Sequence, residues 1–229
     1  MNGFNIFVFK GLGRVQAVGM SHLPTTPRTE AFRRKTRVSG EIAAINAVID
    51  QSLVAHLGFV QDGTPFVLPT NAWRVGDGLY FHFAVGGRIA ENLRQGAEVC
   101  ATLSILDGLV MARSAMHHSV NYRSVMVFGR AEEIVDAGEK LSVLLALVDK
   151  VHSGRAAQVR PPDDKELAAT GVFRLPISEA TVKSRQGPPQ DRADDVALPV
   201  WGGVIPVTQV LGAPQPDQHV PAGLELIPG

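Results

Sequence analysis

Residues 80–93, YFHFAVGGRIAENL, hold the groups whose types and spacing most directly suggest chemistry. The pattern predicts a strand, a glycine turn and a short helix whose first turn carries Arg88. Gly86 and Gly87 let backbone amides approach a ligand closely, and Arg88 offers a planar, permanently charged guanidinium. Together with a helix N-terminus, these groups predict a cradle for a phosphate. A turn that only reverses the chain is the alternative interpretation.

His82 is a polar residue in an otherwise apolar strand. Because successive side chains of a strand alternate between its two faces, His82 is predicted to point away from the face that holds Phe81 and Phe83. An imidazole titrates near neutral pH and can deliver a proton to a reduced product. We therefore name His82 as the candidate catalytic residue, with a solvent-facing histidine as the alternative.

Two further polar stretches stand out. Pro69 lies within a predicted strand, where it removes a hydrogen-bond donor, which is typical of an edge, a bulge or a backbone that faces a ligand. His117 and His118 are adjacent, so in a strand they point to opposite faces and cannot chelate one metal. No carboxylate lies near them at ligand spacing, and we predict no metal site. Ligation of a haem by a single histidine of this region stays open.

Composition limits the possible partners. The 22 basic and 22 acidic residues cancel, which gives no electrostatic reason to expect nucleic acid or an anionic membrane surface. Cys100 is the single cysteine, so an internal disulfide and a cysteine-rich zinc site are excluded. No apolar run approaches the ~20 residues that a membrane-spanning helix requires. We expect a cytoplasmic protein.

The chain is predicted to contain one domain with a tail at each end. Residues 1–39 form a poorly ordered arm, because residues 21–39 are rich in proline, threonine and basic residues. If translation begins at Met20, residues 1–19 are an artefact of the start site. A nucleic-acid-binding arm is an alternative that the neutral domain does not favour. The domain covers residues 40–211, and residues 212–229 form a C-terminal tail.

The hydrophobic periodicity predicts a mainly β domain with few helices. Apolar residues recur at helical spacing in residues 42–49 and 139–151, and residues 88–94 form the short helix after the glycine turn. Strands spaced by about ten residues, with tight turns between them, are typical of an antiparallel meander or barrel. The predicted strands cover residues 53–60, 65–73, 79–83, 99–104, 107–112, 122–136, 172–177 and 180–183, and a last structured piece covers 201–207.

In order and spacing, several stretches resemble the FMN-binding split-barrel superfamily that contains pyridoxamine 5′-phosphate oxidase. The sequence is most similar to the branch of flavin-nucleotide-binding proteins and nitroimidazole-resistance reductases. The resemblance implies an antiparallel, Greek-key-like split β-barrel and a homodimer with two FMN molecules at the subunit interface. The stretches are LGFVQDGTPFVLPTNAW, LYFHFAVGGRIAENL, VCATLS, HSVNYRSVMVFGRAEEI, VKSRQGPP and VWGGVIPV.

The resemblance also implies which residues contact the isoalloxazine ring. Leu68, Pro69 and Thr70 occupy the strand that runs along the ring. His82 and Phe83 match a tyrosine–threonine pair beside the flavin in the oxidase.

The remaining implied contacts concern the phosphate and the second subunit. Gly87 and Arg88 match the serine–arginine phosphate contact of the oxidase, and Ser124 matches a flavin-contacting glutamine supplied by the other subunit. Trp201 matches the tryptophan of a similar W-G-G segment. Ile89 stands where the oxidase has a second basic residue, so Arg88 is expected to hold the phosphate largely alone.

The resemblance does not imply pyridoxamine phosphate oxidation, because the C-terminal arginine- and histidine-bearing motif that binds the substrate phosphate is missing. We predict an FMN-dependent oxidoreductase that reduces a small aromatic or nitro compound with electrons from a nicotinamide donor. The alternative is a non-catalytic protein that stores or senses FMN or haem.

Overall fold

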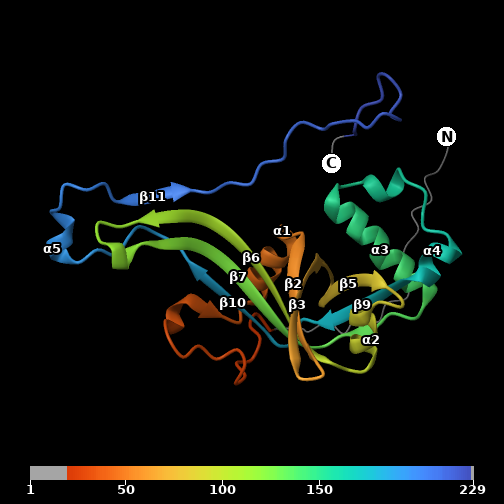
Figure 1. Cartoon of the computed structure of the whole chain (residues 1–229), viewed down its shortest axis with the longest axis horizontal. Helices are drawn as coiled ribbons and strands as arrows, with labels where there is room; N and C mark the ends of the chain where they lie inside the picture. The colour runs from red at the N-terminus through yellow and green to blue at the C-terminus, as the bar shows by residue number, and fades with distance from the viewer. Residues whose placement is uncertain (1–19, 228–229) are drawn as a thin grey trace.

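Two antiparallel sheets form the body of the protein in the computed structural model, which describes residues 20–227 (Figure 1). The larger sheet has the strand order β1-β10-β7-β6-β2-β3, with β11 paired to β6, and the smaller sheet has the order β4-β5-β9-β8. The larger sheet contains β1 (Val38–Ser39), β2 (Val54–Gln61), β3 (Thr64–Asn71), β6 (Glu98–Met111), β7 (Ser119–Arg130), β10 (Ala180–Arg185) and β11 (Gly203–Pro206). The smaller sheet contains β4 (Trp73–Val75), β5 (Gly78–Ala84), β8 (Glu132–Glu133) and β9 (Thr170–Pro176). The predicted mainly β, antiparallel class is confirmed.

The main core lies between the two sheets. Buried residues alternate with more exposed ones along β2, whereas β5 and β9 bury residues on both faces. In β2, Leu57 and Phe59 are buried, and they share one cluster with Phe81 of β5 and Phe173 of β9. Full burial of a side chain of this size contributes about 1.5–3 kcal/mol. Helix α1 (Ile42–Gln51) closes one end of the barrel and buries Ile45, Val48 and Ile49 in the same cluster.

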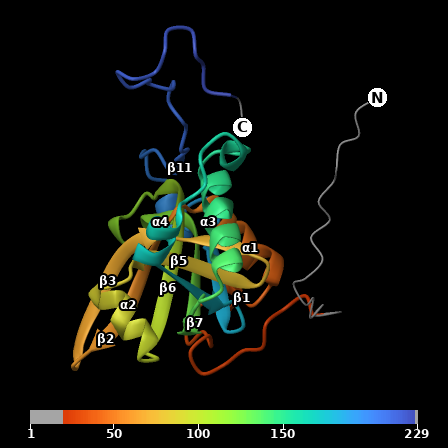
Figure 2. The same ribbon diagram turned by 90° about the vertical axis from the view of Figure 1, so that its right-hand side faces the viewer.

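Helix α3 (Ala137–Val151) covers the smaller sheet on the face away from the barrel core (Figure 2). Asp136 caps the helix, since its carboxylate accepts a hydrogen bond from the Glu139 backbone amide at 2.8 Å. Helix α4 (Asp164–Ala169) follows and leads directly into β9. Beneath α3 lies a second apolar cluster, here called the α3 cluster, formed by Trp73, Tyr80, Ile134, Val143 and Val172.

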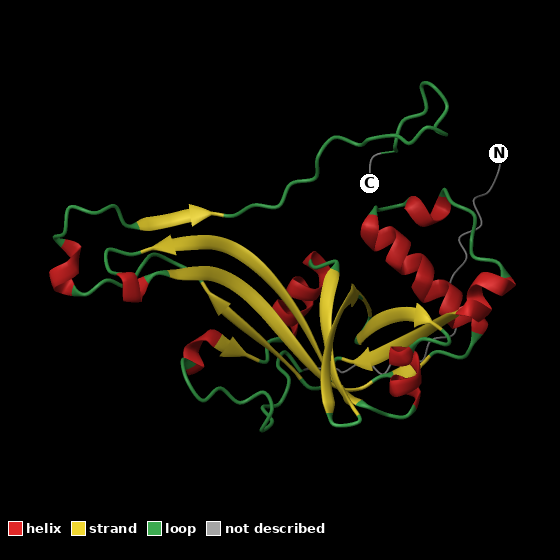
Figure 3. Cartoon of the chain, in the orientation of Figure 1, coloured by secondary structure: helices red, strands yellow, loops and turns green. Residues whose placement is uncertain are grey.

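Strands β6 and β7 continue past the barrel as a long two-stranded arm (Figure 3). The 3-10 helix η2 (Ala115–His117) lies at the end of this arm, and α5 (Ala193–Val196) and β11 return along it. Where the sequence predicted two strands over residues 99–112, the structure has the single strand β6. The register shifts between Leu106 and Gly108, so a β-bulge rather than a turn accommodates the irregularity.

Three other local predictions were wrong. The stretch predicted as one strand over residues 65–73 is β3 and β4, which belong to different sheets and are separated at Ala72. The stretch predicted as one strand over residues 122–136 likewise divides into β7 and β8. A chain that passes from one sheet to the other must leave the first hydrogen-bonded ladder, and the apolar pattern continues through that corner. His117 lies in η2 rather than in a strand.

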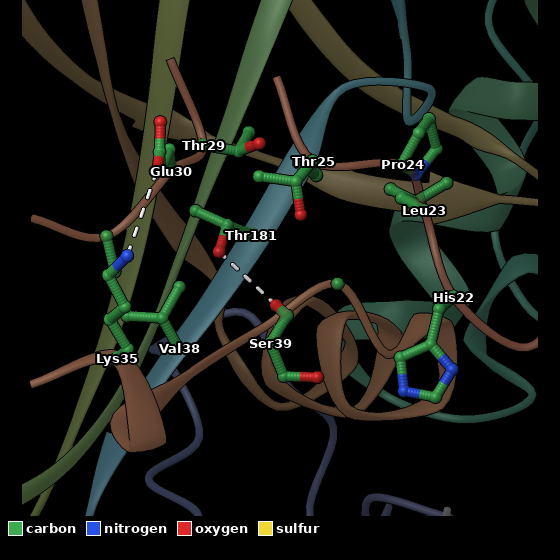
Figure 4. Close-up of a pocket in the computed structure, with 13 residues that line it drawn as sticks. His22, Leu23, Pro24, Thr25, Thr29, Glu30, Lys35, Val38, Ser39 and Thr181 are labelled. Carbon is green, nitrogen blue, oxygen red and sulfur yellow. Dashed lines mark hydrogen bonds and ion pairs between the residues drawn. The ribbon is translucent and has the colours of Figure 1, made fainter. Parts of the chain in front are cut away.

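The N-terminal segment from residue 21 lies against the barrel, which differs from the solvated arm predicted from the sequence. His22 forms a β-bridge with Glu41, and Leu23 packs against the main core. The Arg28 guanidinium contacts Glu98 at 2.7 Å and also pairs with Glu179. Figure 4 shows the resulting pocket of about 460 Å³ between this segment and β10. These contacts hold the segment because Arg28 meets carboxylates from β6 and the β9–β10 turn. Residues 1–19 lie outside the described residues.

From residue 207 to residue 227 the chain forms no helix or strand, and nearly all of its residues are exposed. His152, directly after α3, contacts the backbone oxygen of Ile227 at 2.7 Å. No helix within residues 20–227 has both the length and the apolar character needed to cross a membrane.

Candidate functional site

The candidate site lies where the two sheets separate, between β3 and β5. Phe66 and Leu68 on β3 are half-buried and pack against the main core, as does Phe83 near the end of β5. The Phe83 ring centroid lies 6.4 Å from that of Phe81 and 6.1 Å from that of Phe173. These side chains form an apolar, aromatic wall that suits the flat ring system of an aromatic ligand.

The three β3 residues expected to line a flavin do not share one face. Leu68 pairs with Leu57 and Thr70 pairs with Ala55, whose side chains are buried in the barrel. Pro69 pairs with His56, which is exposed on the outer face of the larger sheet. Alternation along the strand therefore places Leu68 and Thr70 on the barrel side and Pro69 on the outer side.

Arg88 begins helix α2 (Arg88–Arg94) at the edge of this wall. Its guanidinium carbon lies 5.5 Å from the centroid of the Phe66 ring. No carboxylate within residues 20–227 forms an ion pair with Arg88, whereas Arg94 at the other end of the helix is paired with Glu133 at 2.7 Å. Arg88 is thus an exposed cation that is available for an anion.

The glycines before Arg88 serve two different purposes. Gly87 is extended, and a Cβ at this position would lie 3.1 Å from the Ala84 carbonyl oxygen, so a larger residue would crowd the turn. A Cβ at Gly86 would have no neighbour within 4 Å among the described residues, so this residue borders open space. Open space, a free guanidinium and an aromatic wall fit a flavin nucleotide, with its phosphate at Arg88.

His82 points away from this wall, as strand alternation predicts. It pairs with Val172, a member of the α3 cluster, and its ring centroid lies 5.8 Å from that of Trp73. The Nδ1 atom of His82 and the Nε1 atom of Trp73 are both buried without a hydrogen-bond partner among residues 20–227. Burial lowers the pKa of His82 below its ordinary value, because desolvation disfavours the charged imidazolium.

This placement separates His82 from the groups around Arg88. Phe83 and Arg88 face the barrel side of the split, and His82 faces the helix α3 side of the same sheet. Proton delivery by His82, as predicted from the sequence, requires a substrate that reaches this second face.

Ser124 and Trp201 do not join the site within one chain. Ser124 lies on β7, separated from β3 by β6 and β2, and its hydroxyl donates to the Lys183 carbonyl oxygen at 3.4 Å. Trp201 is 64% exposed and precedes β11 on the arm. Within one chain, the strand order therefore does not bring Ser124 or Trp201 to Arg88.

Sequence reasoning missed two residues that shape the site. Phe66 lies under Arg88, and its spacing of two from Leu68 was a signal that both share the barrel face. Trp73 contacts His82 because β4 and β5 pair, with Trp73 opposite Tyr80. The tight turn at residues 75–78 was the signal for this pairing.

The fold and the site together define a flavin-binding split barrel. Residues 41–184 match the family model described as pyridoxamine 5′-phosphate oxidase. The chain belongs to this family, and the predicted resemblance is confirmed. A comparison with curated proteins finds no match.

Three solved structures are similar to this chain. The flavocytochrome Anf3 from Azotobacter vinelandii is 39% identical, with 88% of this chain and 94% of that chain covered and a TM-score of 0.83. The FAD and haem binding protein from Mycobacterium smegmatis is 36% identical, with 84% of this chain and 94% of that chain covered and a TM-score of 0.81. A candidate 5-nitroimidazole antibiotic resistance protein from Bacteroides thetaiotaomicron is 25% identical, with 64% of this chain and 85% of that chain covered and a TM-score of 0.55.

Proposed function

We propose that this protein is a redox protein that binds a flavin nucleotide and a haem and transfers electrons between them. The observation that carries the flavin half is the Arg88 guanidinium, which lies over Phe66 without a carboxylate partner in the described part of the chain. The haem half is supported by the two similar structures, one named a flavocytochrome and the other an FAD and haem binding protein.

The flavin is predicted to be FMN, and FAD is the alternative because one similar protein is named as binding it. Both molecules carry the isoalloxazine ring and a phosphate beside the ribityl chain, so both can use the wall around Phe66 and the cation of Arg88. Ile89 follows Arg88 and is buried, so this position offers no second charge for a diphosphate. This arrangement favours FMN, and extraction of the bound flavin followed by chromatography distinguishes the two.

We further propose a homodimer in which a second copy completes the flavin site. Ser124 and Trp201 lie away from Arg88 in their own chain, and exposed apolar residues such as Val67 line the outer face of the larger sheet. Burial of this face against a second copy would bring Ser124 of one subunit toward the flavin of the other. Light scattering on the purified protein tests this arrangement, and a monomer that retains stoichiometric flavin contradicts it.

The proposed activity is reduction of a small aromatic or nitro compound by electrons from a nicotinamide. The similarity to a candidate nitroimidazole resistance protein supports this substrate class. Anaerobic reduction of the bound flavin by NADH or NADPH, followed by its reoxidation with a nitroimidazole, is the expected result. Flavin that no nicotinamide reduces favours the second candidate, a non-catalytic cofactor-binding protein.

A further inference from the structure

Five of the seven histidines are already engaged in hydrogen bonds. His117 contacts the Ser114 hydroxyl at 2.8 Å, and His118 contacts the Ser114 backbone oxygen at 3.0 Å. The others with ring-nitrogen contacts are His22, His152 and His219. Only His56 and His82 have none within residues 20–227. His56 is exposed on the outer face of β2, whereas His82 lies half-buried between two elements.

His82 has a buried nitrogen that the protein does not satisfy. Its Nδ1 atom has no partner among the described residues, and its Nε2 atom is also without a hydrogen bond but is not buried. Buried polar atoms in native proteins nearly always have partners, so an unpartnered one calls for an explanation such as strain, a redox or catalytic role, or a water or ion at the site. The nearby ring of Trp73, inclined by 55° to the imidazole, restricts the orientation of His82.

Helix α3 supplies apolar side chains on the same face of the smaller sheet. Its sequence AGEKLSVLLALVDKV is mostly apolar, yet Val143 is its only buried residue. Leu144 and Leu147 pack against the α3 cluster but remain half-exposed. These partly accessible leucines can contact an apolar ring system bound beside the helix.

We infer that His82 would ligate the iron of a bound haem through its accessible Nε2 atom, with the leucines of α3 supplying apolar contacts to the haem. This inference rests on the proposed haem binding and identifies the residue that would bind the iron. A protein ligand of this kind is typical of haem sites, where imidazole nitrogen binds the iron. His82 and Phe83 are consecutive and face opposite sides of β5, so the residues that would hold the haem and the flavin lie on opposite faces of one strand.

The test compares the cofactor content and the spectra of four proteins that are purified with added haemin and riboflavin in the growth medium. Wild-type protein is expected to show a Soret band and flavin absorbance. His82→Ala is expected to lose at least ~10-fold in haem affinity, because even the loss of a group that only supports a metal ligand has an effect of that size. His219→Ala, at an exposed histidine of the C-terminal segment, is the matched control and is expected to keep both cofactors.

One further measurement and one further variant make the test decisive. Flavin content measures whether the His82→Ala variant has folded, since Arg88 and Phe66 lie on the other side of the sheet. His82→Cys supplies a thiolate, itself a haem ligand, and is expected to retain haem with a shifted Soret band and altered EPR signals.

The outcomes separate this inference from the proposed function. A haem-loaded His82→Ala variant with an unchanged Soret band and EPR spectrum overturns the assignment of His82 and leaves the proposed haem binding intact. Wild-type protein that takes up flavin but no haem overturns both.

Discussion

The guanidinium of Arg88 lies 5.5 Å from the centre of the Phe66 ring, at the split between the two sheets. The two residues come from α2 and β3, which the chain connects through the β4–β5 hairpin. A guanidinium over an aromatic ring is held without a carboxylate, so its charge stays available for an anionic ligand. This relationship is the structural basis for placing the flavin phosphate at Arg88.

Replacement of Arg88 tests that placement. Arg88→Ala is expected to weaken flavin binding by ~10- to 100-fold, because a hydrogen bond to a charged group contributes about 1.5–3 kcal/mol. Fluorescence titration of the apoprotein with FMN and with FAD measures the change. Arg88→Lys retains the charge and is expected to lose less affinity.

Arg160→Ala is the control for this experiment, since Arg160 is an exposed arginine paired with Glu166 near α4. It is expected to bind flavin as the wild type does. Equal affinities of wild type and Arg88→Ala would show that the phosphate lies elsewhere.

The outer face of the larger sheet is expected to be a subunit interface. Val67 is 68% exposed on β3, and Val67→Lys places a charge on that face. We expect the variant to shift toward the monomer and to lose flavin with it, because burial of an unpaired charge is unfavourable. Sedimentation velocity and the ratio of flavin to protein measure both effects.

Val135 is a matched control because it is 85% exposed in the loop before α3. Val135→Lys is expected to remain dimeric. If Val67→Lys behaves in the same way as this control, the interface lies on another surface.

Lys150 gives a prediction about pH. Burial lowers the pKa of Lys150 to about 8, with Asp50 opposing the shift and Arg74 adding to it. Its ammonium donates to the backbone oxygens of Ile49 and Ala72 at 2.8 and 3.0 Å. Between about pH 8 and the ordinary lysine pKa of about 10.4, the unfolded chain binds more protons than the folded protein. The contribution of Lys150 to the free energy of unfolding therefore rises with pH across this window.

The variant Lys150→Met removes that contribution. The free energy of unfolding is measured with urea at pH 8 and at pH 10. Between these two pH values we expect it to rise less, or to fall more, in the variant than in the wild type. Lys165→Met is the control for loss of an exposed lysine. Identical pH dependence of the wild type and Lys150→Met would contradict the lowered pKa.

Much of the barrel could be predicted from the sequence, because alternation of apolar residues and tight turns are local signals. The same local pattern predicted that His82 points away from the face of Phe81 and Phe83. It also predicted that Arg88 lies in the first turn of a helix after two glycines. The break at Ala72 could not be predicted, since the chain changes sheets there without a change in its apolar pattern.

The contacts that determine the site are long-range. The pairing of Arg28 with Glu98 and Glu179 holds the N-terminal segment on the barrel, although its composition predicts a solvated arm. The separation of Ser124 and Trp201 from Arg88 depends on strand order, which local periodicity does not encode. The partial exposure of the α3 leucines likewise depends on how the helix packs on its sheet, which the helix sequence alone does not encode.

The absorption spectrum of the purified protein, with its cofactors extracted and identified, tests the central claim most directly. The account predicts flavin absorbance together with a Soret band, and an extract that contains FMN or FAD. A colourless protein that takes up neither added flavin nor added haemin would contradict it.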